Sequence, residues 1–578
     1  MSGLQGVASA QTPADDAARA ARQFQSQQSE QERMRQLEEL QRTNRAPSGD
    51  VPTPPVPQSS AKGERCFDIK TIKVEGVHLI AEETIRATVA GWEGRCLGLA
   101  EINSVLKALT FLYIERGYIT SRAYLQEQNL KKTSELAISI VEGKLEAIRL
   151  NGKDDERHVV ATAFPWMVGH PVSLRDIEQG LDQINRLRSN DAKTALAAGT
   201  QQGYSILDVT NTPTPRLHVT VGTDNYGATV SGPWQSHIDT VIDNVFGVND
   251  LWQFGYQRTN NRSPTFLSEE RPNSDTVNGS VSIPYGFWTM GIDSTWSQYH
   301  SSVPGQVSTI DTSGGTILVS PYLTRMIYRD QTSKTFATAR FTWKDTDNDI
   351  LGTRIDVASR RLSIAQLDLN HVRTVLGGQF SASIGYQHGL AVLGAFEDFS
   401  APDGSPKGEF QKYTATLGYM RPFDLGAVTP VFNTYIMGQW SDDHLFGTEQ
   451  MAFGGFASIR GVRDAILYAD KGAIARNELS LMLPAPQQAD IARIIGRIEP
   501  YAAVDVGYAV PTQGYYDSSG FLVGNDGGTM VGVSGGIRNR AGRLAFDVYY
   551  ARLVIKPPLP AAGMPPSSIV QGRLSVSF

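Results

Sequence analysis

The sequence predicts a membrane β-barrel of about 16 antiparallel strands, preceded by a helix and by two small α/β repeats. Two observations predict the barrel. From about residue 216 to the end, short segments alternate polar and apolar residues with the two-residue period of a strand. The last segment places Leu574, Val576 and Phe578 on one face, with polar side chains on the other. A strand that lies between lipid and water needs one face of each kind.

Composition and charge exclude several other classes of protein. No run of about 18 apolar residues occurs, which argues against a helix that crosses a membrane. The net charge of −6 comes without a basic block, so we expect no nucleic-acid partner. A soluble β-sandwich is the alternative fold, but it would need two sheets without a charged, wet interior. Trp252, Phe254 and Tyr256 illustrate the outward face of one predicted barrel strand.

The first 65 residues predict a tethered helix. We interpret residues 1–10 as the remnant of a signal peptide, because their end has the small residues typical of a cleavage site. Residues 11–43 are rich in Ala, Gln, Glu and Arg, a helix-forming composition with only a weak apolar stripe. Such a helix lies in a polar environment or is mobile. Residues 44–65 are rich in proline and predict an extended, semi-rigid linker.

Two copies of an α/β pattern occupy residues 66–143 and 144–212. Each copy has the order strand, helix, helix, strand, strand, and its first strand ends at a glycine turn. The order recurs after about 75 residues, which is typical of a tandem repeat. Residues 213–578 are the predicted barrel region, with a long extracellular loop over residues 442–472.

The two cysteines predict a disulfide. Cys66 and Cys96 are the only cysteines of the sequence, and they enclose a loop of about 30 residues. A single pair is typical of a protein that folds in an oxidising compartment such as the periplasm. Free, buried thiols are the alternative interpretation.

Strand parity places charged side chains inside the barrel near the long loop. The strand around Asp505 puts its valines on the lipid face, so that Asp505 and Gly507 face inward. The preceding strand puts its leucines on the lipid face, which leaves Arg476 and Glu478 in the lumen. A carboxylate shielded from water needs a positively charged partner.

Arg460, in the long loop, is the candidate partner of Asp505. A guanidinium binds a carboxylate through two parallel hydrogen bonds, and it stays charged when it is buried. The adjoining Gly461 lets the backbone turn tightly at the loop tip. The alternative is that Arg460 is an ordinary loop arginine.

Several motifs resemble one superfamily. Ile459-Arg460-Gly461-Val462 resembles the VRGY-type loop signature of the outer-membrane insertase and two-partner secretion superfamily, with Ile and Val at the outer positions. Residues 504–507 resemble its G/F-x-D-x-G strand motif, and both α/β repeats resemble POTRA domains. Residues 476–479 are similar to the secretion branch (TpsB, FhaC/ShlB-like). A run on the first barrel strand is similar to the same branch: Asp224, Asn225 and Gly227.

The resemblance implies roles for these residues. Arg460 and Gly461 of the loop, with Asp505 and Gly507 of the strand, would lock the loop in a folded-back position inside the barrel. The helix of residues 11–43 would be a plug in the resting pore. The chain ends on Phe578, which would be the outer-membrane signal. Four neighbours would support the loop in the lumen: Ile459, Val462, Arg476 and Glu478.

The resemblance also implies a function and its partners. The protein would be a translocator in the outer membrane of a Gram-negative bacterium, with its POTRA domains in the periplasm. Those domains would recognise an unfolded adhesin, haemolysin or contact-dependent toxin, which the barrel would secrete and could activate. The implied partners are a large exoprotein with a β-helical secretion domain (TpsA-like), outer-membrane lipid and the barrel-assembly machinery. An insertase of other barrels and a porin-like channel are the alternatives.

We expect neither catalysis nor a cofactor. The nine histidines show no paired metal spacing, and no nucleotide site is visible. Residues 532–536 match the G-x-S-x-G pattern of hydrolases, but they lie in a segment that alternates like a strand. The acidic run 345–349 lacks the terminal glutamate of a calcium loop, and we interpret it as a turn between strands.

Overall fold

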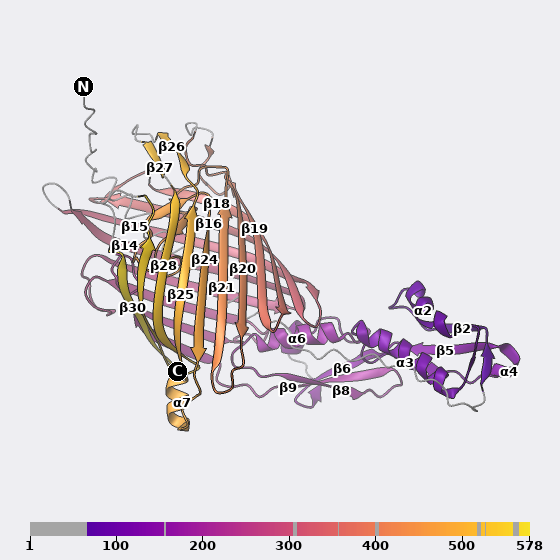
Figure 1. Cartoon of the computed structure of the whole chain (residues 1–578). Coiled ribbons are helices and arrows are strands. Elements are labelled where there is room, and N and C mark those ends of the chain that lie inside the picture. Colours follow the sequence, from indigo (N-terminus) through magenta and orange to yellow (C-terminus); the bar gives the residue numbers. More distant parts are fainter. Residues whose placement is uncertain are drawn as a thin grey trace.

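The computed structural model describes residues 66–154, 158–304, 309–356, 358–398, 404–516, 522–525, 527–558 and 566–578. The predicted signal-peptide remnant, plug helix and linker therefore lie outside the described residues. Figure 1 shows a barrel with two α/β repeats that extend to one side of its foot. The first repeat is the farther of the two from the barrel.

The barrel closes from sixteen antiparallel strands in the described part of the chain, which confirms the predicted fold class. The first and last strands pair along the seam, from Thr220 opposite Ser577 to Asp224 opposite Arg573. The short β17 (Thr353–Arg354) extends the sheet beside β16. The strands, in order around the barrel, are β10 (Leu217–Asp224), β11 (Trp234–Asp243), β12 (Leu251–Asn260), β13 (Asn273–Tyr285), β14 (Trp288–Pro304), β15 (Thr309–Arg329), β16 (Ser333–Ile350), β18 (Arg360–Val375), β19 (Gly378–Leu390), β20 (Gln411–Pro422), β21 (Thr429–Trp440), β24 (Gly472–Met482), β25 (Arg497–Ala509), β28 (Gly528–Arg540), β29 (Leu544–Ile555) and β30 (Ser568–Ser577).

Side chains alternate across the barrel wall as the sequence predicts. On β25, Val504 and Tyr508 are exposed on the outer surface, whereas Tyr501 and Asp505 are buried inside. This two-residue alternation is the pleat of a strand, and it gives one face to lipid and the other to the lumen. The terminal Phe578 is exposed, and its backbone N–H donates to the carbonyl oxygen of Val219 on β10. Among the described residues, no helix has the length and apolar character to cross a membrane.

The first repeat packs two helices on a three-stranded sheet with the order β2-β5-β4. β2 and β5 run parallel, which requires the helical crossover between them. Buried aliphatic side chains of the helices and the sheet form one core, with Val105, Leu109 and Ile138 at its centre. The elements are β1 (Phe67–Ile69), β2 (Thr71–Glu75), α2 (Glu82–Val89), η1 (Ala90–Trp92), β3 (Arg95–Leu97), α3 (Leu99–Glu115), β4 (Arg122–Leu125), α4 (Leu130–Thr133) and β5 (Glu135–Val141).

The second repeat has a four-stranded sheet with the order β7-β6-β9-β8. Its long helix begins at Ser173, whose hydroxyl accepts a hydrogen bond from the backbone N–H of Asp176. The helix packs Ile177 and Ile184 on the sheet. The elements are β6 (Lys144–Leu150), β7 (Lys153–Asp154), α5 (His158–Ala163), α6 (Leu174–Asn185), β8 (Lys193–Ala198) and β9 (Tyr204–Thr210).

Ion pairs attach helix α6 to the foot of the barrel. Asp182 accepts hydrogen bonds from Arg329 at the end of β15 and from Lys334 at the start of β16, each at 2.6 Å. Arg329 also donates to Glu178 at 3.0 Å, and the side chains of Arg329 and Lys334 are buried. Burial makes these pairs sensitive to the loss of one partner, so they fix where the second repeat sits.

The prediction of a turn at the acidic run 345–349 is wrong. These residues continue strand β16, and the chain reverses after them, at Leu351 and Gly352. Arginines of the neighbouring strands explain the difference, because Arg361 pairs with Asp345 at 2.6 Å and Arg354 with Asp347 at 2.9 Å. Residues 532–536, by contrast, lie within strand β28 as predicted.

The predicted disulfide is present between Cys66 and Cys96, with the two Cα atoms 5.4 Å apart. It joins the residue before β1 to the middle of β3, and these two strands form a separate ribbon beside the main sheet. In the chain-entropy picture, a loop of this length contributes roughly 3–4 kcal/mol by restricting the unfolded chain.

We expect the double substitution Cys66→Ser with Cys96→Ser to destabilise the first repeat and to leave the barrel intact. Limited proteolysis should cut the variant between residues 66 and 143 at a protease concentration that spares the parent protein. Heat-modifiable migration on gels serves as the control for the barrel, and it should not change. An identical digestion pattern for both proteins would contradict this role of the disulfide.

Candidate functional site

The loop between β21 and β24 folds back into the barrel. It carries a short hairpin of β22 (Met451–Phe453) and β23 (Leu467–Ala469), and the residues between these strands form its tip. From Met451 to Val462, every residue except Phe456 is buried. Loop tips on the outside of a barrel contact water, so this burial places the tip against the inner wall.

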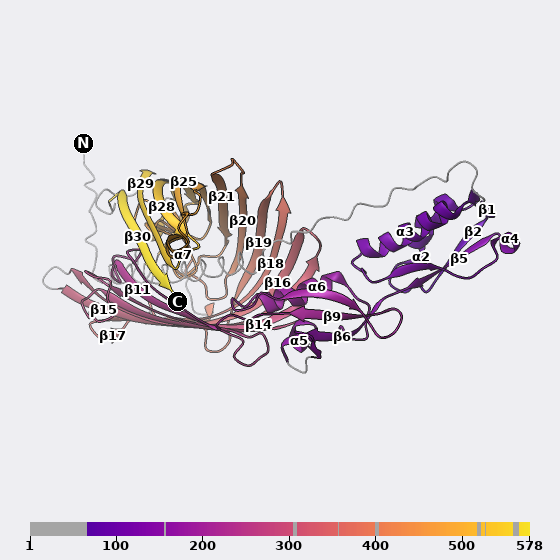
Figure 2. The ribbon, with the colours of Figure 1, turned by 90° about the horizontal axis from the view of Figure 1, so that it is seen from below.

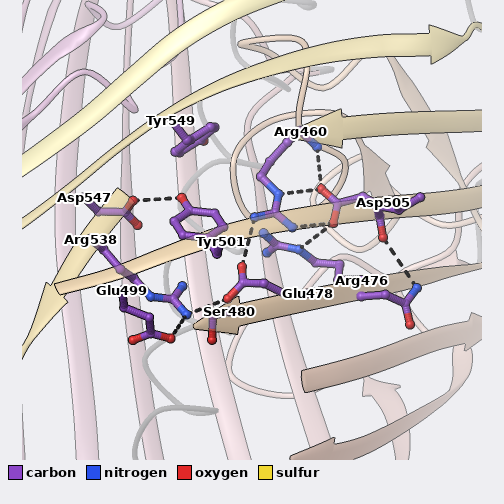
Figure 3. A network of polar contacts seen from close by, with 12 residues as sticks. Arg460, Arg476, Glu478, Ser480, Glu499, Tyr501, Asp505, Arg538, Asp547 and Tyr549 are labelled. Carbon is purple, nitrogen blue, oxygen red and sulfur yellow. Dashed lines mark hydrogen bonds and ion pairs between the residues drawn. The ribbon is translucent and has the colours of Figure 1, made fainter. Parts of the chain in front are cut away.

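At the tip, Arg460 is bound to Asp505 of β25 by three hydrogen bonds (Figure 3). Its Nε donates to Oδ2 at 2.7 Å, its Nη2 donates to Oδ1 at 2.7 Å, and its backbone N–H donates to Oδ2 at 3.0 Å. Asp505 is 1% exposed and Arg460 is 5% exposed. Removal of either partner would leave a buried charge without its main counter-charge, and loss of one partner of a buried pair destabilises by about 3–5 kcal/mol. We call this pair the lock.

Two neighbours on strand β24 extend the lock. Glu478 accepts from Nη1 of Arg460 at 3.3 Å, so this guanidinium contacts two carboxylates. Arg476 lies opposite Asp505 in the strand register, with its Nε 3.6 Å from Oδ1, and it donates to the carbonyl oxygen of Ala457 at 3.0 Å. Both side chains therefore face the lumen and hold the loop tip from below, as Figure 3 shows.

Glycines let the loop approach the wall closely. Gly461 adopts a φ of 121°, which L side chains rarely adopt, and a Cβ there would collide with the backbone of β29 at Leu553. A Cβ on Gly507 of β25 would collide with the side chain of Ile459. A Cβ on Gly532 of β28 would collide with the carbonyl of Arg460. Because Gly507 and Gly532 carry no side chain, the loop can lie directly against the backbone of the wall.

Ile459 and Val462 anchor the loop through apolar packing. Both are buried, in one cluster with Phe453 of the loop and Met530 and Leu553 of the wall. Val462 stands where the resembling signature has an aromatic residue, and its smaller side chain is fully enclosed. Burial of two aliphatic side chains contributes about 1.5–3 kcal/mol each.

Two of the three residues of the predicted first-strand motif lie after the end of strand β10. Asp224 is the last residue of β10, whereas Asn225 and Gly227 follow the strand, so the prediction that all three lie on it is wrong. The reason is local, because Asp224 accepts from the backbone N–H of Tyr226 at 3.0 Å and turns the chain inward. Asn225 then bridges to β30, accepting from the N–H of Gly572 at 2.8 Å.

The long loop also contacts this seam between the first and last strands. Arg463 donates to the carbonyl oxygen of Asn225 at 2.6 Å. Asp464 accepts from the backbone N–H and the hydroxyl of Thr229, at 2.9 and 2.6 Å. Phe456 stacks on Tyr226 with ring centroids 4.7 Å apart. The loop tip therefore touches both β25 and the β10–β30 seam.

A second group of inward charges adjoins the lock, and two of its members, Arg538 and Glu499, were not singled out from the sequence. Arg538 of β28 donates to Glu478 at 2.6 Å and to Glu499 of β25 at 2.8 Å. Nearby, the hydroxyl of Tyr501 donates to Asp547 of β29 at 2.8 Å. The parity that identified Asp505 also assigns Glu499 to the lumen, so this signal was present in the sequence.

A second attachment lies on another part of the wall. Glu449, near the start of the loop, accepts from Lys344 of β16 and from Lys412 of β20, each at 2.8 Å. Glu449 is 6% exposed, and both lysine side chains are largely buried. The lock binds β25, several strands away around the barrel. The loop is therefore held at both ends of its path across the lumen.

The described residues contain no group of three or more His, Cys, Asp or Glu side chains arranged to hold a metal ion. The charged groups of the loop and wall instead pair with each other. An arrangement of buried ion pairs and apolar contacts positions a segment of chain.

Comparisons with known proteins agree with this architecture. Residues 203–538 match the model of the haemolysin secretion/activation protein family ShlB/FhaC/HecB. Residues 67–143 match the ShlB-type POTRA domain, and residues 144–198 match a further POTRA model.

Individual relatives cover most of the chain. The outer membrane transporter CdiB of Dickeya dadantii is 32% identical over 454 residues, which are 78% of each chain. The hemolysin transporter protein ShlB of Serratia marcescens is 28% identical over 501 residues, 86% of this chain and 83% of the relative. The solved structure of CdiB from Escherichia coli superposes on this chain with a TM-score of 0.82 at 28% identity. The superposition covers 97% of this chain and 98% of the CdiB chain.

We expect Glu449→Gln to release the start of the long loop from the wall. The change removes the negative charge that Lys344 and Lys412 share, and loss of one partner of a buried pair destabilises by about 3–5 kcal/mol. Hydrogen exchange followed by mass spectrometry should show faster exchange in residues 441–450. The control is Asp442→Asn, which removes a surface pair with Lys471 and should leave exchange unchanged. Equal exchange rates in both variants would contradict the second attachment.

Proposed function

Because the chain belongs to the ShlB/FhaC/HecB family, and is thus an outer-membrane transporter of two-partner secretion, we propose that it exports one large unfolded exoprotein. Its two repeats are POTRA domains (POTRA 1 and POTRA 2), which place them in the periplasm. The cargo proposed is a haemolysin, adhesin or contact-dependent toxin with a β-helical secretion domain. The similarity to the hemolysin transporter ShlB supports the first of these classes.

Exposed sheet edges in both POTRA domains support recognition of an unfolded chain. Strand β4 forms one edge of the POTRA 1 sheet, and strand β8 forms one edge of the POTRA 2 sheet. Tyr124 and Leu125 of β4 and Leu196 of β8 are exposed apolar side chains at these edges. An extended peptide can add itself to such an edge through main-chain hydrogen bonds, with alternate side chains in contact with the apolar residues.

The lumen supports passage of an extended chain. A cavity of about 310 Å³ lies inside the barrel, above helix α6 of POTRA 2. Uncharged polar side chains such as Thr289, Gln366 and Asn370 line much of it. They can hydrogen-bond to the backbone of any sequence. Six charged side chains share the lining with them: Asp182, Arg186, Lys334, Arg340, Asp368 and Lys412. Folding of the cargo outside the cell would make its movement unidirectional.

We assign the lock the role of positioning the long loop during export. The loop crosses the lumen between the pair Arg460–Asp505 and the pair of lysines at Glu449. An unfolded exoprotein can pass through the lumen only if this loop is held beside its path or moves out of it. The terminal Phe578 would serve an earlier step, in which the barrel-assembly machinery recognises the last strand.

We expect Arg460→Ala to lower export sharply while the barrel stays folded. The substitution removes both guanidinium bonds to Asp505 and leaves this carboxylate only the backbone N–H of residue 460 and Arg476, so the attachment of the loop tip to β25 is weakened. Export is measured as the amount of the partner exoprotein that appears in the culture medium. Heat-modifiable migration of the transporter on gels reports the folded barrel.

Lys471→Ala is the matched control, because it removes an exposed ion pair at the other end of the same loop. It should leave export near the parent level. Normal export by the Arg460→Ala transporter would refute the role of the lock. Loss of export in both variants would instead point to a general need for an intact loop.

We further propose that the helix of residues 11–43 occupies the resting pore, with residues 44–65 as its tether. Deletion of residues 11–43 should then raise the conductance of the purified protein in planar lipid bilayers. The mechanism is steric, since removal of a helix widens the path for ions. An unchanged conductance would argue against a plug, whereas loss of all channels would show that the variant did not insert.

A further inference from the structure

POTRA 2 contacts the barrel wall from both sides, through helix α6 on the inside and helix α5 on the outside. On one side of the wall, Gln183 of α6 donates to the carbonyl oxygen of Gly286, in the turn between β13 and β14, at 2.9 Å. On the other side, the backbone N–H of the same Gly286 donates to the carbonyl oxygen of Thr162 in α5, at 2.8 Å. Figure 2 shows α6 within the ring of strands and α5 outside it, beyond β14. The turn that follows α5 is therefore on the lipid side.

This turn presents one large aromatic side chain. Phe164 and Met167 are buried in the core of POTRA 2, whereas Trp166 between them is 71% exposed. Trp166 has a φ of 61°, a backbone conformation that bulky residues seldom adopt. Such a conformation persists only where the surrounding structure imposes it, and here it directs the indole away from the domain core.

Trp166 packs on the lipid-facing surface of the barrel. Its ring meets that of Tyr285 edge to face, with centroids 5.1 Å apart. Tyr285 ends β13 on the same face as Val277, which is exposed on the outer surface, and it lies opposite Trp288 of β14. Trp252 of β12 also lies on this outer face, near the periplasmic end of its strand. These rings form an aromatic belt at the foot of the barrel.

We propose that Trp166 anchors POTRA 2 in the periplasmic phospholipid leaflet of the outer membrane. Aromatic rings with a polar edge collect at the level of the lipid headgroups, where the ring contacts acyl chains and the N–H contacts water. Trp166 continues the aromatic belt of the barrel, so the lipid that borders Tyr285 also borders Trp166. POTRA 2 is then held at two points, by its ion pairs to Arg329 and Lys334 and by lipid.

Brominated lipid tests this contact directly. The full-length protein and its Trp166→Phe variant are reconstituted in phosphatidylcholine vesicles, with plain acyl chains or with chains brominated near the headgroup. The difference between the two emission spectra isolates the fluorescence of Trp166. We expect brominated lipid to remove most of this difference emission. Trp92→Phe in POTRA 1 is the matched control, and its difference emission should be equal in both kinds of vesicle.

Two results would overturn the proposal. The difference emission of Trp166 could survive in brominated vesicles and be quenched by aqueous iodide, which would place the ring in water. It could also be insensitive to both quenchers until the exoprotein is added, which would make Trp166 a contact for cargo. Because Phe keeps most of the packing on Tyr285, equal circular dichroism of variant and parent would show that POTRA 2 remains folded.

Discussion

The buried ion pair between Arg460 and Asp505 is the constraint on which the interior of the barrel depends. A loop of about thirty residues gains little by leaving water, because its backbone must find new hydrogen-bond partners. Here one guanidinium and one backbone N–H satisfy a carboxylate that parity forces into the lumen. The pair compensates the desolvation of both groups, and Gly507 and Gly532 provide the space. Without the pair, the loop would lose hydrogen bonds that hold it in the lumen, and the aspartate would lose its main counter-charge.

The same loop links parts of the barrel that are distant in sequence. Glu449 connects it to β16 and β20, Arg460 to β25, and Arg463 to the segment after β10. Most of the loop between these contacts is buried. The loop therefore connects the wall at β16, β20 and β25 to the β10–β30 seam, where the barrel closes on itself. This connection is a property of the whole set of contacts and of no single residue.

Much of this architecture could be predicted from the sequence, because barrel strands obey a strict geometric rule. The alternation of side chains along each strand was enough to predict that Asp505 and Glu478 face the lumen and that the valines of β25 face outward. The acidic run 345–349 was misjudged because a strand can carry successive aspartates on one face when arginines of neighbouring strands pair with them. The contact of Glu449 with Lys344 and Lys412 was beyond sequence reasoning, since it depends on the path of the loop across the lumen. The position of Trp166 depends likewise on how POTRA 2 docks.

The attachment of α6 makes the entrance of the barrel eccentric. Its contacts run along the feet of β13, β15 and β16, so one arc of the rim is roofed by POTRA 2. On the other side of the ring, helix α7 (Ala489–Ile495) lies at the foot of the barrel, between β24 and β25 (Figure 1). The periplasmic mouth of the lumen is therefore bordered by one helix on each side, α6 and α7.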